Sequence, residues 1–253
     1  MLIRAEQIEQ LREGVLRETE SRMVAHVKEH LPGHFKVLGE SRLHLLAARA
    51  LQAASGCGMY TEGSAMLFLE LMVLFGSECT GDPQLPFSRC LADGSATEQA
   101  RADALHREAV EYRAAVSGEN GRHLLAALER LGAYPTEWRA ATAQEFRASL
   151  SARLQALYPE KSARLEVGGL EALISRAIEQ AQACGLRTPA AVALLSAMML
   201  VWGAGALNDP RFPSFQEALA GDAGDASTRV ARLRTALDAE LKRWLPGRRA
   251  VNV

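Results

Sequence analysis

The sequence has few isoleucines, no closely spaced cysteine pair and no apolar leader. Isoleucine occurs only four times, whereas alanine and leucine dominate, and this balance favours helices over sheets because β-branched residues prefer strands. The four cysteines form no Cys-x-x-Cys motif, which indicates a reducing compartment for a chain of this size. The residues after Met1 turn polar at once and lack the apolar core of a signal peptide. We therefore expect an all-helical, cytoplasmic protein.

Concentrated positive charge and convincing membrane spans are also missing. The 29 lysines and arginines balance 30 aspartates and glutamates, and no long basic run occurs. Nucleic acid is therefore not an expected partner. Residues 190–207 contain no charged side chain, but the segment is short for a span, rich in alanine and glycine, and without basic flanks. We predict a buried helix there and no membrane insertion.

Only one histidine motif suggests catalysis. The sequence has no Gly-x-Ser-x-Gly elbow and no glycine-rich phosphate loop, so we predict no catalytic residue, no metal and no cofactor. His26-Val-Lys-Glu29-His30 matches the pattern in which two histidines one helical turn apart bind zinc and the glutamate acts as base; Glu108 or Glu111 would be the third ligand. Because so short a pattern often arises by chance, we interpret these as solvated surface histidines. A zinc-dependent hydrolase is the alternative.

One segment of the sequence occurs twice. Residues 43–86 align with residues 170–213 without a gap, at an offset of 127 residues. The identical pairs include Arg49/Arg176, Cys57/Cys184, Gly58/Gly185, Thr61/Thr188, Gly76/Gly203 and Asp82/Asp209. Further along, the register slips by one residue, so that Arg101 matches Arg229. An ungapped match of this length predicts a tandem repeat.

Each copy is predicted to be a module of four to five helices, and the two modules to be related by a pseudo-two-fold axis. In copy one, an amphipathic helix ends at Pro32, a second helix spans about 40–56, and an apolar third helix runs from Thr61 to about Cys79. A short helix and a long final helix follow in each copy. Capping boxes predict that the short helix of copy two starts at Ser214 and that the long final helix of copy one starts at Ser95. We place copy one at 1–116, a linker and connecting helix at 117–131, copy two at 132–246 and a frayed tail at 247–253.

Arginine and aspartate recur at matching positions of the two copies. Each aspartate precedes a proline, so we predict that Asp82 and Asp209 tighten turns, and that Arg49 and Arg176 satisfy carbonyls or a carboxylate. The alternative is a repeated recognition loop over 82–87 and 209–214. In that case the candidate partner-binding residues are Gln84, Phe87, Arg211 and Phe212.

Several strings of copy one resemble a protein family. They are Met23-Val-Ala-His26, Leu31-Pro32, Gly58-Met-Tyr-Thr-Glu62, Leu71-Met-Val-Leu-Phe75-Gly76 and Asp82-Pro-Gln-Leu-Pro-Phe87. Over residues 5–105 they resemble bacterial helical proteins encoded beside type VI secretion spike proteins and effectors. The resemblance implies a protein partner, namely a secreted effector or toxin or the spike protein, and brings no catalytic residue. We expect a non-enzymatic adaptor or chaperone for a secreted effector, with an immunity protein that neutralises a toxin as the alternative.

Overall fold

Helices make up all the regular structure of the described chain. The structure, a computed structural model, describes residues 5–135, 137–138, 142–220 and 225–245, with side chains from residue 13 onward. The first half contains α1 (Ala5–His30), α2 (Pro32–Leu38), α3 (Glu40–Gly56), α4 (Glu62–Phe75), α5 (Ser88–Ala92) and α6 (Glu98–Ser117). The turn η1 (Glu119–Gly121) and α7 (Arg122–Gly132) follow. The second half contains α8 (Ala143–Leu157), α9 (Pro159–Ser162), α10 (Gly169–Ala183), α11 (Pro189–Trp202), η2 (Ala206–Asn208), α12 (Pro213–Leu219) and α13 (Ala226–Trp244). The predicted all-α class is confirmed.

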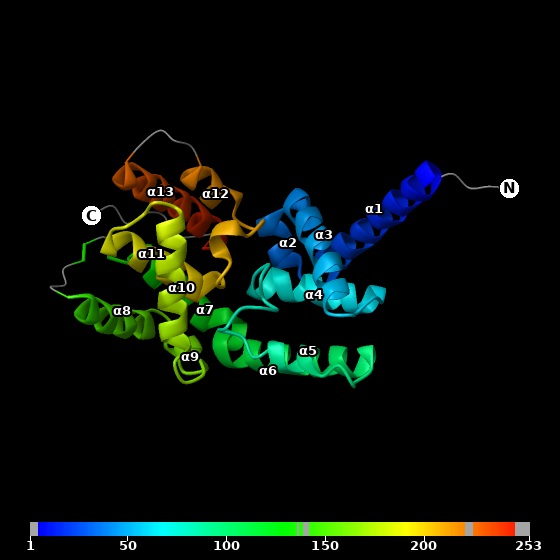
Figure 1. Cartoon of the computed structure of the whole chain (residues 1–253), viewed down its shortest axis with the longest axis horizontal. Coiled ribbons are helices and arrows are strands. Elements are labelled where there is room, and N and C mark those ends of the chain that lie inside the picture. The colour runs from blue at the N-terminus through cyan, green and yellow to red at the C-terminus, as the bar shows by residue number, and fades with distance from the viewer. Residues whose placement is uncertain (1–4, 136, 139–141, 221–224, 246–253) are drawn as a thin grey trace.

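The helices of the two halves follow one another in the same order, from α1–α6 to α8–α13. Figure 1 shows the first half on the right and the second on the left. The apolar helices α4 and α11 begin and end 127 residues apart. Each is capped by a threonine, Thr61 or Thr188, whose side chain accepts a hydrogen bond from a backbone N–H in the first turn. Each ends before a glycine with positive φ.

Three predicted helix boundaries are wrong. The third helix ends at Phe75 rather than Cys79, because Gly76 leaves the helical conformation with a φ of 118°. The long final helix of copy one starts after Thr97, whose hydroxyl accepts from the Ala100 N–H, and not at Ser95. In the second half, proline occupies the first position of α12, so that this helix begins before Ser214. Neither predicted capping box forms.

The uncharged segment 190–207 forms α11 and η2 at the centre of the second half. Residues 191–207 are all buried, in agreement with the predicted buried helix. Within the described ranges, no helix combines the length and apolarity that a bilayer crossing would require.

α7 connects the two halves. The predicted linker, residues 117–131, forms the end of α6, η1 and most of α7, whereas the predicted tail lies outside the described residues. α7 starts beside the end of α6 and continues into the second half, where it contacts α8, α11 and α13 (Figure 1).

Candidate functional site

Two buried aspartates join the halves. Asp82 Oδ2 accepts a hydrogen bond from the backbone N–H of Ala204 at 2.7 Å, and Asp209 Oδ2 accepts one from the N–H of Ser77 at 2.8 Å. Ser77 and Ala204 are themselves 127 residues apart, so each half extends the same carboxylate to the same position of the other. Buried carboxylates bound to backbone N–H groups make strong, charge-assisted hydrogen bonds.

The side chains two residues after each aspartate extend this junction. Gln84 Nε2 donates to the Met199 carbonyl of the second half at 3.0 Å, and Arg211 Nη1 donates to the Val73 carbonyl of the first half at 3.2 Å. The Arg211 guanidinium also lies 3.0 Å from the carboxylate of Asp209. This ion pair offsets the cost of burying the arginine.

A lysine is buried beside the same junction. Lys161 is only 5% exposed, and burial lowers its pKa to about 8, an effect that the carboxylate of Asp82 opposes. The junction therefore contains two carboxylates and two potential cations, Lys161 and Arg211. Their charges balance, and an unpaired charge would be costly in this buried interior.

Arg49 and Arg176 also reach across the junction. Arg49 Nη1 donates to the carbonyl of Asn208 at 3.1 Å, and Arg176 Nη2 pairs with the carboxylate of Glu78. Each arginine thus contacts the loop that follows the apolar helix of the other half.

The loop side chains proposed to bind a partner lie in the interior instead. Phe87 and Phe212 have no exposed surface, and Gln84 and Arg211 are 2% exposed. Phe87 packs edge to face on Phe75, with ring centroids 5.2 Å apart. Both Asp-Pro turns therefore direct these four side chains toward the core.

The His-x-x-Glu-His motif lies at the end of α1. His26 Nε2 is 2.6 Å from Glu70 Oε1 on α4, and the rings of His26 and His30 meet edge to face. Glu108, one of the proposed third ligands, pairs with Arg89 instead. Among the described residues, no three His, Cys, Asp or Glu side chains gather closely enough to hold a metal ion. In this geometry His26 links α1 to α4.

The surface of α4 between α1 and α6 carries partly exposed side chains, among them Glu70 and Leu74. Both helices pack against α4, but over the described ranges they make almost no contact with each other. Figure 1 shows α4 between them. At the C-terminal end of α4 this surface opens into a cleft of about 600 Å³. The cleft is lined by Leu74 and Phe75 of α4, by Val110 and Arg113 of α6, and by η1 and Leu124 at the start of α7. Val110 is 53% exposed, although it is apolar. We refer to this surface as the α4 groove and define it by His26, His30, Glu70, Leu74, Val110 and Arg113.

The cleft at the end of the α4 groove also contains a histidine that stays neutral. Burial, with help from the charges of Arg113 and Arg211, lowers the pKa of His34 to about 4. Its ring meets the ring of Trp244 edge to face, with centroids 5.7 Å apart. Arg113 is exposed and has no ion-pair partner in the part of the chain that the structure describes. At neutral pH Arg113 is therefore the cation that this end of the groove offers.

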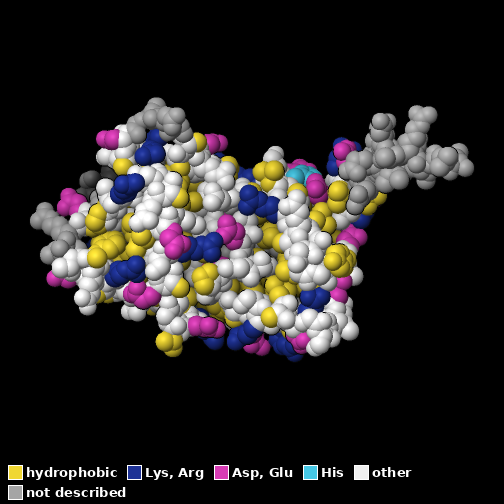
Figure 2. Space-filling model, in the orientation of Figure 1, with side chains coloured by type: hydrophobic (Ala, Val, Ile, Leu, Met, Phe, Trp, Pro, Cys, Tyr) yellow, Lys and Arg dark blue, Asp and Glu magenta, His cyan; other side chains and the backbone are white. Residues whose placement is uncertain are grey.

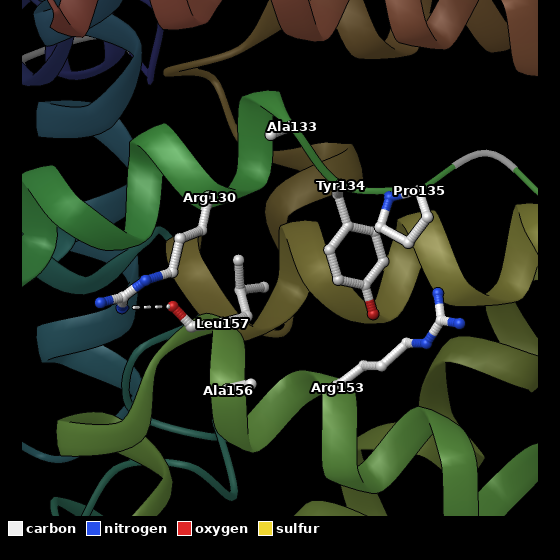
Figure 3. A pocket seen from close by; sticks show the side chains of 7 residues that line it. All are labelled: Arg130, Ala133, Tyr134, Pro135, Arg153, Ala156 and Leu157. Atoms are coloured by element: carbon white, nitrogen blue, oxygen red, sulfur yellow. Dashed lines mark hydrogen bonds between the residues drawn. The ribbon is translucent and has the colours of Figure 1, made fainter.

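In the second half, α7 packs on α8, α11 and α13. Arg130 Nη1 donates to the Leu157 carbonyl at the end of α8, at 3.1 Å (Figure 3). Arg234 of α13 donates to the carbonyls of Gly132 and Tyr134 at the end of α7. Figure 3 shows the Tyr134 ring between the ends of α7 and α8, with its hydroxyl directed toward α8. α7 is thus held on both sides, and a cavity of about 360 Å³ remains between its end and α8, lined by Arg130, Tyr134 and Arg153 among others (Figure 3).

No protein-family model matches the chain, and neither does any curated protein or solved structure. What the chain does must therefore follow from its own geometry. On the face drawn in Figure 2, Lys and Arg side chains alternate with Asp and Glu, without a continuous patch of either sign.

The α4 groove is the feature that sequence reasoning missed. The sequence carries no local signal for it, because the exposure of Val110 on α6 depends on which helices pack around it.

Proposed function

We propose that the chain is a tandem duplication of one helical module and that its copies are related by a pseudo-two-fold axis. The common order of six helices supports this. So do the reciprocal hydrogen bonds of Asp82 and Asp209, because an exchange of identical contacts is what a two-fold relation produces.

The function we propose is non-enzymatic binding of another protein at the α4 groove. The observation that carries this proposal is the cleft of about 600 Å³ at the end of α4, beside which the apolar Val110 is 53% exposed and Arg113 has no ion-pair partner among the described residues. Apolar side chains that are left exposed beside a structured core, such as Leu74 and Val110, contribute favourable free energy when a partner buries them.

The resemblance of residues 5–105 supports a narrower role. It favours a cytoplasmic adaptor or chaperone that holds a secreted type VI effector, with an immunity protein that neutralises a toxin as the alternative. Both roles require a protein complex, and both fit the same groove.

Co-expression with the effector encoded nearest to this chain tests the proposal. We expect a stable complex in size-exclusion chromatography with light scattering, and we expect Val110→Glu to abolish it by placing a charge in the groove. Val167→Glu is the matched control, since Val167 is fully exposed in a loop of the second half, outside the groove. Failure to form a complex, or a complex that survives Val110→Glu, would refute binding at this site.

Two further assays separate the roles. An adaptor is required for export of the effector, so its deletion removes the effector from the medium. An immunity protein instead blocks the activity of the purified toxin.

A further inference from the structure

We propose that the cavity between the end of α7 and α8 binds a small monocarboxylate with an apolar body, whose carboxylate pairs with Arg153 and accepts a hydrogen bond from the hydroxyl of Tyr134. The cavity lies at the C-terminal end of α7, whereas the cleft of the α4 groove lies at its start. The site is therefore separate from the proposed protein-binding surface and does not depend on it.

The cavity has the size and the lining of a small-molecule site. Its volume of about 360 Å³ is at the lower end of the range of about 300–1,000 Å³ that is usual for such sites. Ala133, Pro135, Ala156 and Leu157 supply apolar surface, and none of the described lining residues is acidic. The space therefore suits a molecule with one ring or a short acyl chain, apolar over most of its length.

One buried polar group in the wall has no partner. Tyr134 is only 5% exposed, and its hydroxyl makes no hydrogen bond within the described part of the chain. Figure 3 shows this hydroxyl directed toward α8, on the side of the cavity where Arg153 lies. Burial raises the pKa of Tyr134 well above its usual value, so the hydroxyl keeps its proton and can donate it. Leaving such a donor unpaired costs free energy, which an acceptor on a ligand would recover.

Arg153 is the cation that the cavity offers. Its guanidinium lies over the ring of Trp138, 4.4 Å from the ring centroid, and it has no ion-pair partner among the residues that the structure describes. The other arginine of the lining, Arg130, donates to the carbonyl of Leu157, and Figure 3 shows its guanidinium directed away from Tyr134. A carboxylate that enters the cavity therefore meets two donors together, one of them charged.

Contacts behind the cavity hold both donors in place. Arg234 of α13 donates to the carbonyl of Tyr134 at 3.2 Å, which fixes the backbone at that residue. The indole of Trp138 donates to the carbonyl of Pro135 at 3.2 Å and packs edge to face on the phenylalanine of α8. Because Trp138 is held in this way, the guanidinium of Arg153 that stacks on it is also positioned. A site whose donors are held before binding loses less conformational entropy when the ligand arrives.

Titration of the ¹⁵N-labelled chain with phenylacetate tests the site. Each tryptophan gives one indole N–H signal in a nitrogen–proton correlation spectrum. Trp138 lies beside the cavity, whereas Trp202 and Trp244 pack on Phe212 and His34, outside its lining. We expect the Trp138 signal, assigned with Trp138→Phe, to shift with a Kd of about 1 mM or below, as small ligands of this size can reach. The other two signals should stay in place.

Two substitutions test the donors. We expect Arg153→Gln to weaken the binding of phenylacetate about tenfold or more, because it removes the charged donor. Tyr134→Phe should weaken it about fivefold, while the chain stays at least as stable because the unpaired hydroxyl is gone. The matched control is Arg147→Gln, which removes the same charge from the same helix but outside the cavity, where Arg147 pairs with Glu171. Its affinity should equal that of the wild type.

Matched ligands test the chemical class. Phenylethyl alcohol keeps the ring but lacks the carboxylate, so we expect it to bind about tenfold more weakly than phenylacetate, and we expect Arg153→Gln to remove this difference. If Arg153 only supported Trp138, its loss would weaken the acid and the alcohol alike. Hexanoate separates the two possible bodies of the ligand: binding as tight as that of phenylacetate supports acyl chains, and weaker binding supports aromatic acids.

Three results would overturn the site. The first is that neither acid shifts the Trp138 signal. The second is that the acid and the alcohol bind the wild type equally, which would leave no role for the carboxylate. The third is that Tyr134→Phe and Arg153→Gln bind phenylacetate as tightly as Arg147→Gln does.

Discussion

At the scale of single residues, the two aspartates of the matching Asp-Pro turns differ in the charge of their partners. Asp82 receives a backbone N–H from the other half and the amide of Gln84, which are neutral donors. Asp209 receives the equivalent N–H and also pairs with Arg211, which cannot lose its proton. The lysine near Asp82 can lose its proton, since its pKa is about 8.

This asymmetry predicts unequal costs of truncation. We expect Asp209→Ala to lower the free energy of unfolding by about 3–5 kcal/mol, because it leaves a buried guanidinium without its carboxylate. Asp82→Ala should cost about 1–3 kcal/mol, the range for leaving buried neutral donors unpaired. Urea unfolding followed by circular dichroism measures both. Equal losses would contradict the ion-pair explanation.

His34 predicts a pH dependence of stability. Its pKa is about 4 in the folded chain and about 6.5 in the unfolded chain, so the unfolded chain binds the proton more readily. Its contribution is therefore complete above pH 6.5 and is lost as the pH falls toward 4. Between pH 7 and 4.5 we expect the wild type to lose about 2 kcal/mol more than His34→Gln, measured by urea unfolding at each pH. Parallel losses in the two proteins would argue against a neutral buried imidazole.

At the scale of elements, α4 and α11 end where their backbones come closest. A Cβ on Gly203 would lie 2.6 Å from the carbonyl oxygen of Phe75, and one on Gly76 would lie 2.9 Å from that of Trp202. Both glycines also have positive φ, at 103° and 118°. The helix ends therefore meet through the backbone itself, which explains why no larger residue fits at either position.

This contact makes a sharp prediction for Gly203→Ala. We expect it to lower the free energy of unfolding by about 3 kcal/mol or more, since strain in φ adds to a clash with a backbone atom. The control is Gly63→Ala in the first turn of α4, where a Cβ meets nothing within 4 Å; it should raise stability by about 0.5 kcal/mol. Thermal unfolding of both variants checks this. A tolerated Gly203→Ala would mean that the halves are less closely joined.

At the scale of the whole molecule, the buried junction makes the two halves one cooperative unit. Of the three tryptophans, Trp244 packs on His34 of the first half, so the measurement uses the Trp244→Phe variant. In this variant the fluorescence of Trp138 and Trp202 reports on the second half, whereas circular dichroism reports on both halves. We expect the two urea transitions to coincide, because unfolding either half exposes the polar groups of the other. An early loss of helix without a fluorescence change would show that the first half unfolds alone.

The helices could be predicted from the sequence because the signals that start and end a helix act over a few residues. The start of the third helix near Thr61, the second helix over 40–56 and the connecting helix within 117–131 were all predicted from neighbouring residues. The two predicted capping boxes did not form. Pro213 takes the first position of α12, and Thr97 rather than Ser95 caps α6.

The sequence by itself determined the all-helical class, the order of the helices and the matching of positions 127 residues apart. Only the tertiary structure decided that the Asp-Pro turns point inward, because the hydrogen bond between Asp82 and Ala204 joins residues 122 positions apart. It also decided that the α4 groove is open. Local propensity specifies which helices form, whereas burial and exposure depend on which helices then pack against one another.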